Sequence, residues 1–150
     1  MFHQFFHHIS QMRKYILLFL VVSLFFSCSN NDFNNSNPYI PNYTVALTIN
    51  LNLPAYSNLR YVSNSVYYAG QGAKGIIIFN TSGTTFNAFD AACPNQALSS
   101  CSTMTINGIN AVCACDNASY NLFTGLATGK QYPMKQYRVE VSGNLLRVSN

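Results

Sequence analysis

The hydrophobic and polar positions divide the chain into three zones. An apolar run occupies residues 15–26, an asparagine-rich polar stretch occupies residues 29–41, and short or alternating apolar segments fill the remainder. The apolar run is shorter than the roughly 20 residues that a membrane-spanning helix needs. The polar stretch has too little apolar surface to fold by itself. The pattern therefore predicts a targeting segment, a tether and one folded domain.

The folded zone has the pattern of β-strands. Residues 44–51 alternate apolar and polar side chains, which predicts a strand whose buried face consists of Val45, Leu47, Ile49 and Leu51. Residues 75–79 form a continuous apolar run between turn residues, as is typical of a strand buried on both faces. Residues 85–90 follow after a hairpin-type connection at residues 80–83. These segments predict antiparallel pairing.

Two more hairpins are expected toward the C-terminus. Residues 104–106 and 109–112 flank Asn107 and Gly108, which suit a two-residue turn because both tolerate a positive φ. The apolar segments on either side of residues 142–144 form the other hairpin. No stretch of the folded zone has the apolar spacing of a long helix. We therefore expect an all-β domain, a small antiparallel sandwich or barrel of about 105 ordered residues with one core.

The composition excludes a disordered chain and a nucleic-acid-binding face. Of 150 residues, 49% are hydrophobic and 8% are charged, whereas disordered chains are rich in charge. After Cys28 the six basic and four acidic residues are scattered. The sequence thus lacks a basic patch for a phosphate backbone. Its acidic residues are also too sparse for a general acid–base pair.

The N-terminal zone has the features of a bacterial lipoprotein signal. Arg13 and Lys14 precede the apolar run, and Ser27 precedes Cys28. We interpret residues 12–27 as the signal peptide. Cys28 would then become the acylated first residue of the mature chain and anchor it to the membrane through its lipid. The alternative is a plain anchor helix.

The residues around this signal fit the same interpretation. Residues 1–11 are explained as an overlong start-codon assignment, because Met12 and the basic pair after it form a normal signal start. This segment contains every histidine of the chain, namely His3, His7 and His8. A metal site at these histidines is the alternative. Residues 28–42 would be the lipidated cysteine and a flexible tether, and residues 43–150 the domain.

The polar tail after the acylated cysteine resembles those of lipoproteins displayed by Bacteroidetes-type bacteria. The resemblance implies a lipid-anchored protein of the bacterial cell envelope, at the outer membrane.

Four cysteines remain after Cys28, and an even number in an exported protein favours disulfides. They are Cys93, Cys101, Cys113 and Cys115. Four cysteines allow three pairings, and a bond between Cys113 and Cys115 would be strained, which leaves two. A four-cysteine site for zinc or a 2Fe–2S cluster is the alternative. The spacing of Cys113 and Cys115 is poor for tetrahedral zinc, and export favours oxidation.

The sequence around these cysteines resembles the two cluster-binding boxes of Rieske iron–sulfur proteins. Residues 86–95, which end in Cys93, a proline and Asn95, are similar to the first box, Cys-x-His, and its aromatic lead-in. Residues 112–125 are similar to the second box, Cys-Pro-Cys-His-Gly-Ser, and the Thr-Gly that follows it. The resemblance covers residues 75–148 and implies a small Rieske-like β domain.

The resemblance fails at the residues that would hold the cluster. A Rieske centre holds one iron by two thiolates and the other by two imidazoles. Cys93 and Cys113 occupy the thiolate positions of the family, and Asn95 and Asp116 occupy the imidazole positions. Asparagine is a poor ligand for iron and aspartate a hard, anionic one, while Asn117 replaces the glycine of the second box. We therefore expect neither a cluster nor another metal.

The family also implies a pairing of the cysteines. In its cytochrome-complex branch, a disulfide joins a cysteine after the first box to the middle cysteine of the second. By this resemblance we expect a Cys101–Cys115 disulfide. Without a cluster, Cys93 and Cys113 would face each other across the two box loops. They would then form a second disulfide or remain buried free thiols.

These features predict a non-enzymatic protein. A serine hydrolase would lack its histidine base, and no glycine-rich phosphate loop precedes a helix. We expect a binding or structural module at the membrane surface, with no catalytic residue and with a partner that the sequence does not identify. One alternative is an electron carrier that holds a 2Fe–2S cluster with unconventional ligands. The other is a thiol–disulfide redox protein that uses Cys93 and Cys113.

Overall fold

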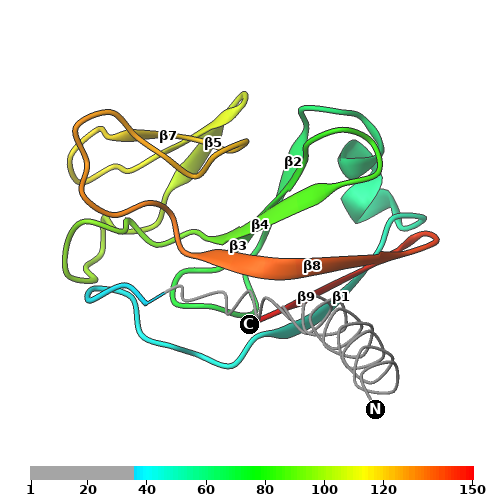
Figure 1. Ribbon diagram of the computed structural model, residues 1–150, viewed down its shortest axis with the longest axis horizontal. Coiled ribbons are helices and arrows are strands. Elements are labelled where there is room, and N and C mark those ends of the chain that lie inside the picture. The colour runs from blue at the N-terminus through cyan, green and yellow to red at the C-terminus, as the bar shows by residue number, and fades with distance from the viewer. Residues whose placement is uncertain (1–35) are drawn as a thin grey trace, which may run out of the picture. The chain divides into compact units, whose positions relative to one another are not determined.

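The computed structural model describes residues 36–150, which form an all-β domain (Figure 1). This confirms the predicted fold class. In chain order, the elements of the described residues are β1 (Ala46–Asn50), the 3-10 helix η2 (Pro54–Arg60), β2 (Ser65–Tyr68), β3 (Ile76–Asn80), β4 (Phe86–Asp90), β5 (Thr105–Asn107), β6 (Asn110–Val112), β7 (Ser119–Asn121), β8 (Gln136–Ser142) and β9 (Leu145–Ser149).

Several predictions concern residues before this range. The overlong start at residues 1–11 with its histidines, the signal peptide at 12–27, the lipidation site Cys28 and the first part of the tether lie outside the described residues. Within residues 36–150, no helix is both long and apolar enough to span a membrane.

The strands form two antiparallel sheets. The large sheet has the order β1-β9-β8-β4-β3-β2, and the small sheet has the order β5-β6-β7. Figure 1 shows the small sheet at one end of the large one. The predicted hairpins are present as the pairs β3–β4, β5–β6 and β8–β9.

Strand β3 is buried along its whole length, as its continuous apolar run predicted. Its side chains alternate between two hydrophobic cores, because successive residues of a strand point to opposite faces. Ile76 and Ile78 join the first core, which also contains the four alternating apolar residues predicted for the first strand. Ile77 and Phe79 join the second core, together with residues of the small sheet. The expectation of one core is therefore wrong, because the small sheet covers the second face of β3.

The β5–β6 turn lies one residue later than predicted. Asn107 pairs with Asn110, so Gly108 and Ile109 form the two-residue loop. Gly108 has a φ of 60°, and Ile109 is not at positive φ. A positive φ at the first turn position alone is the pattern of a type II′ turn with glycine first. A turn centred on Asn107 and Gly108 would need a positive φ at both.

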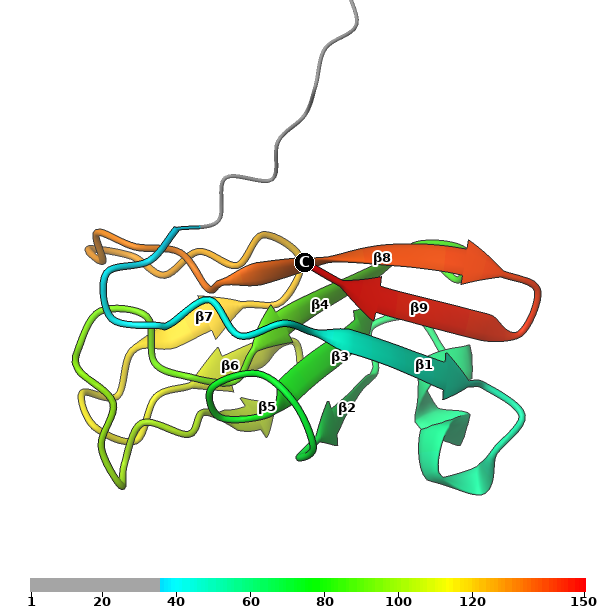
Figure 2. The same cartoon turned by 90° about the horizontal axis from the view of Figure 1, so that it is seen from below.

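The segment before β1 packs on the domain. Ile40 is 1% exposed, and the ammonium of Lys135 donates to the Pro41 carbonyl at 3.0 Å and to the Asn42 side-chain oxygen. In Figure 2 this segment runs from the end of the domain that carries β5–β7 toward β1. These residues belong to the stretch expected to be a flexible tether. The apolar contact and the lysine hold them on the domain instead.

Candidate functional site

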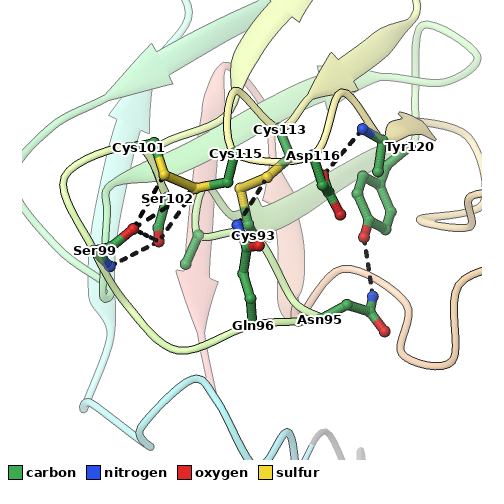
Figure 3. Close-up of a disulfide and its surroundings, with 12 residues drawn as sticks. Cys93, Asn95, Gln96, Ser99, Cys101, Ser102, Cys113, Cys115, Asp116 and Tyr120 are labelled. Carbon is green, nitrogen blue, oxygen red and sulfur yellow. Dashed lines mark hydrogen bonds between the residues drawn. A yellow bond between two sulfur atoms is a disulfide. The ribbon is translucent and has the colours of Figure 1, made fainter.

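The two box sequences form two loops that disulfides hold together (Figure 3). The first loop follows β4 and closes on itself, because the Cys93 N–H donates to the Ser102 carbonyl at 2.8 Å. The second loop follows β6. There the Asn117 N–H donates to the Cys113 carbonyl at 2.9 Å, and the Cys113 N–H donates to the Ala118 carbonyl at 2.9 Å. The backbone of each loop thus fixes where its cysteines lie.

Cys93 and Cys113 form what we call the inner disulfide, with their Cα atoms 5.6 Å apart. Each residue is 1% exposed, and both belong to the second core. Gln96 Nε2 donates to Cys113 Sγ over 3.3 Å. Of the two states expected for this pair, a disulfide or two buried thiols, the structure has the disulfide.

Cys101 and Cys115 form what we call the outer disulfide, with their Cα atoms 5.2 Å apart. Cys101 is exposed and Cys115 is half-buried. The Ser99 hydroxyl lies 3.2 Å from Cys101 Sγ and 3.7 Å from Cys115 Sγ. The Ser102 hydroxyl lies 3.9 Å from Cys115 Sγ. This pairing is the one that the Rieske resemblance implies.

Asn95, at the first imidazole position of the family, ties the first loop to two other parts of the chain. Its Nδ2 donates to the Tyr120 hydroxyl at 2.9 Å and to the Tyr132 carbonyl at 2.7 Å. Its Oδ1 accepts the Tyr132 N–H at 2.9 Å. Burial raises the pKa of Tyr120, so its hydroxyl stays protonated at neutral pH. Both ends of the Asn95 amide are thus engaged within the protein.

Asp116, at the second imidazole position, pairs with Lys130. Lys130 Nζ lies 2.6 Å from Asp116 Oδ2, and Asp116 Oδ1 accepts the Ala118 N–H at 3.0 Å. The hydrogen bond from Lys130 holds the pKa of the Asp116 carboxyl below its usual value. Each carboxylate oxygen therefore already has a partner in the protein.

Asn117 adopts a backbone conformation that glycine favours. Its φ is 57°, and it stands where the Rieske box has glycine. Asparagine is one of the few residues with a side chain that visit this left-handed region readily. The replacement therefore keeps the turn of the second loop without glycine.

The residues at this site do not fit a 2Fe–2S cluster. The two thiolate positions are bonded to each other, and the metal ligand is a thiolate rather than a disulfide sulfur. The imidazole positions carry an amide and a carboxylate that bond to protein groups. The sulfurs of Cys93, Cys113 and Cys115 lie within 4.8 Å of one another. The loops thus gather sulfur atoms, but all of them are in disulfides.

Five residues that support the site were not predicted from the sequence. They are Gln96, Ser99, Ser102, Lys130 and Tyr132. Lys130 is 14 positions from Asp116, and Tyr132 is 37 positions from Asn95, so no local pattern links them. Gln96 and Ser99 lie between Cys93 and Cys101, and Ser102 follows Cys101 directly. This closeness to the cysteines in sequence is the feature that could have identified them.

Comparison with known proteins gives matches only among solved structures, since no family model and no curated protein matches the chain. One match is the complex of reduced oxygenase and oxidized ferredoxin in carbazole 1,9a-dioxygenase, at 19% identity over 71% of this chain and 94% of that one, with a TM-score of 0.49. The Sphingomonas yanoikuyae B1 ferredoxin matches at 17% identity over 71% of this chain and 99% of that one, with a TM-score of 0.46.

A third match is the E. coli protein NirD, at 16% identity over 72% of this chain and 98% of that one, with a TM-score of 0.45. Two of these three structures are, or contain, a ferredoxin.

Proposed function

We propose that this chain is an exported, lipid-anchored protein whose Rieske-like domain has no cluster and serves as a non-enzymatic binding or structural module. Cys28 carries the lipid in this proposal, and the domain lies at the surface of the bacterial envelope, at the outer membrane. No residue of the domain is assigned a catalytic role.

The observation that carries the proposal is the state of the four ligand positions. Cys93 and Cys113 are joined in a buried disulfide. Asn95 bridges to Tyr120 and Tyr132 through its amide, and Asp116 is paired with Lys130. Each position that would bind iron in a Rieske centre instead links one loop of the domain to another. The site therefore supports a rigid loop structure rather than electron transfer.

Lipid anchoring rests on the sequence. Arg13 and Lys14 precede the apolar run, and Cys28 follows it directly. Acyl chains supply membrane affinity at about 0.8 kcal/mol per buried CH₂. Residues 29–37 are polar apart from Phe33, which suits a tether between membrane and domain.

The absence of a cluster is tested on the full chain, purified in detergent under anaerobic conditions. The chain is reduced, offered ferrous iron and sulfide, and desalted. We expect less than one iron per chain, no visible charge-transfer absorbance and no electron paramagnetic resonance signal of a reduced cluster. Two irons and two sulfides per chain with such a signal would establish the electron carrier instead. A known Rieske ferredoxin treated in parallel shows that the reconstitution works.

The lipid anchor is tested by expressing the full chain in a bacterium fed a radiolabelled fatty acid. We expect label in the wild-type chain, none in Cys28→Ala, and fractionation of the wild-type chain with the outer membrane. Equal label in both would refute Cys28 as the anchor. Cys101→Ala is the matched control, because it also removes one cysteine but leaves the proposed lipidation site.

A further inference from the structure

The two disulfides lie next to each other between the two box loops (Figure 3). The sulfurs of Cys93, Cys113 and Cys115 are within 4.8 Å of one another, although Cys115 is bonded to Cys101. Thiol–disulfide exchange needs a thiolate that reaches a sulfur of a second disulfide. A thiolate formed at Cys115 would have the inner disulfide beside it.

The two bonds differ in access from solvent. Cys101 is exposed, whereas Cys93 and Cys113 are each 1% exposed. The rate of exchange depends on access to the attacked sulfur. A dissolved dithiol therefore reaches the outer disulfide at Cys101 and is kept from the inner one while the domain is folded.

We propose that the two disulfides form a relay, in which reduction at the exposed Cys101 is passed through Cys115 to the buried Cys93–Cys113 bond. The reductant is a dithiol. This inference goes beyond the proposed function, because it adds a response to thiol reductants that a binding module does not require.

In the first step the dithiol reduces the outer disulfide. One thiolate of the reductant attacks Cys101 Sγ, and the bond to Cys115 breaks. The second thiolate of the reductant then displaces Cys101. The reductant leaves as its own disulfide, having lost two electrons, and Cys101 and Cys115 have become thiols.

In the second step the disulfide moves inward. The Cys115 thiolate attacks Cys93 Sγ, so a Cys93–Cys115 bond forms and the Cys93–Cys113 bond breaks. Cys113 leaves with the electron pair and takes up the proton that Cys115 gave to the solvent. No further oxidant or reductant is consumed. The product has one disulfide, Cys93–Cys115, and thiols at Cys101 and Cys113.

Polar groups stand where each thiolate would form. The hydroxyls of Ser99 and Ser102 lie 3.7 Å and 3.9 Å from Cys115 Sγ and can donate to its thiolate. Gln96 Nε2 already donates to Cys113 Sγ over 3.3 Å. Stabilising a leaving thiolate speeds exchange, so Gln96 favours Cys113 as the leaving group and Cys93 as the sulfur that is attacked.

The relay would release the part of the first loop around Cys101 while the two box loops stay covalently joined. Cys93 and Cys115 belong to the two box loops, so their new bond still connects these loops. Cys101 loses its covalent partner. Cys113 also loses its covalent partner but stays packed in the second core, whereas Cys101 is exposed. The exposed part of the first loop around it would thus respond to reduction without loss of the second core.

The test uses the full chain in detergent with one equivalent of dithiothreitol. The reaction is quenched with acid, free thiols are blocked with N-ethylmaleimide, and the peptides are mapped by mass spectrometry. We expect label on Cys101 and Cys113 and a peptide pair joined through Cys93–Cys115. Label on Cys101 and Cys115 with the inner disulfide intact would overturn the relay. Circular dichroism of each sample verifies that the domain is folded.

Two single variants separate the relay from direct reduction. In Cys115→Ser the Cys93–Cys113 bond should open roughly tenfold more slowly than in the wild type, since the thiolate that attacks it is missing. In Cys101→Ser, which leaves Cys115 free, label should appear on Cys113 without any added reductant. Equal inner-bond reduction in Cys115→Ser and wild type, or label on Cys115 alone in Cys101→Ser, would refute the relay.

A third variant and an iron assay complete the design. Gln96→Leu should lower the yield of Cys113 label while leaving reduction of the outer bond unchanged, and an unchanged yield would contradict the role of Gln96. Iron is measured in every sample beforehand. If the samples hold no iron and the label does not appear on Cys101 and Cys113, the relay is refuted and the proposed function is not. If the samples hold stoichiometric iron, the proposed function is refuted, because it states that the domain has no cluster.

Discussion

Asn95 and Asp116, which the sequence resemblance aligns with the imidazole positions of the Rieske boxes, are each held by neighbouring protein groups. The amide of Asn95 bonds to Tyr132, and the carboxylate of Asp116 pairs with Lys130. The sequence shows directly that neither position carries a histidine. It does not show that Tyr132 and Lys130 bind these side chains, because the segment after β7 that carries them approaches the loops only in the folded domain.

Asn117 supports a prediction about backbone conformation. Its φ of 57° costs an ordinary residue more than it costs asparagine or glycine. Asn117→Ala should lower the free energy of unfolding by about 1 kcal/mol, whereas Asn117→Gly should stay within about 0.5 kcal/mol of the wild type. Urea unfolding of the three chains measures the difference. Equal stability of the alanine and glycine variants would contradict the conformational argument.

The Asp116–Lys130 pair supports a prediction about pH. The pKa of Asp116 is lowered in the folded domain, chiefly by the Lys130 hydrogen bond. The pair therefore stabilises the fold above the unfolded value of 3.8 and ceases to do so as the pH falls through the folded pKa. Lys130→Gln should raise the pKa of Asp116 toward 3.8, as followed by NMR titration of its carboxyl carbon.

The matched control for this titration is Lys74→Gln, which removes a lysine that is not bonded to Asp116. The pKa of Asp116 should keep its wild-type value in that variant. The stability difference between wild type and Lys130→Gln should also vanish at a pH below the folded pKa. A difference that persists there would show that the lysine acts by packing rather than by charge.

At the scale of elements, strand β3 was the most predictable part of the fold, because its continuous apolar run needs burial on both faces. The sequence did not reveal what covers its second face, since the strands of the small sheet have three residues each and one or no buried residue apiece. The helix η2 was also missed. It begins at Pro54 and buries Leu59, which is too short a pattern to recognise.

The docked segment before β1 supports a prediction at this scale. Lys135 is 3% exposed and donates to Pro41 and Asn42. Lys135→Met keeps the apolar stem but removes these bonds, so hydrogen exchange at the Ile40 amide should speed up roughly tenfold. Lys130→Met is the control and should leave that amide unchanged. Unchanged exchange in Lys135→Met would mean that the other contacts of the segment, such as buried Ile40 and the hydrogen bond from Asn37 to the Pro94 carbonyl, hold it without the lysine.

At the scale of the whole domain, the disulfides join loops that follow strands of different sheets. The loop with Cys93 follows β4 of the large sheet, and the loop with Cys113 follows β6 of the small sheet. The small sheet has short strands, and its attachment to the rest depends on the second core and on these bonds.

A comparison of double variants tests this attachment. The inner and outer disulfides close segments of 20 and 14 residues, so chain entropy predicts nearly equal contributions. Cys93→Ala with Cys113→Ala should lower the free energy of unfolding by about 2–4 kcal/mol and by more than Cys101→Ala with Cys115→Ala, because it also leaves a void in the second core. Guanidinium unfolding measures both. A larger loss of unfolding free energy in Cys101→Ala with Cys115→Ala would contradict the argument that burial makes the inner disulfide the more stabilising one.

The all-β class, the fully buried strand and the lack of histidine in residues 43–150 could all be predicted from the amino-acid sequence. These depend on local alternation and on residue type, which are readable along the chain. The folded domain was needed to show that there are two cores, that later segments hold Asn95 and Asp116, and that Cys115 lies beside the inner disulfide. The physical reason is that such contacts join residues far apart in sequence, whose approach is set by sheet packing and loop closure rather than by local pattern.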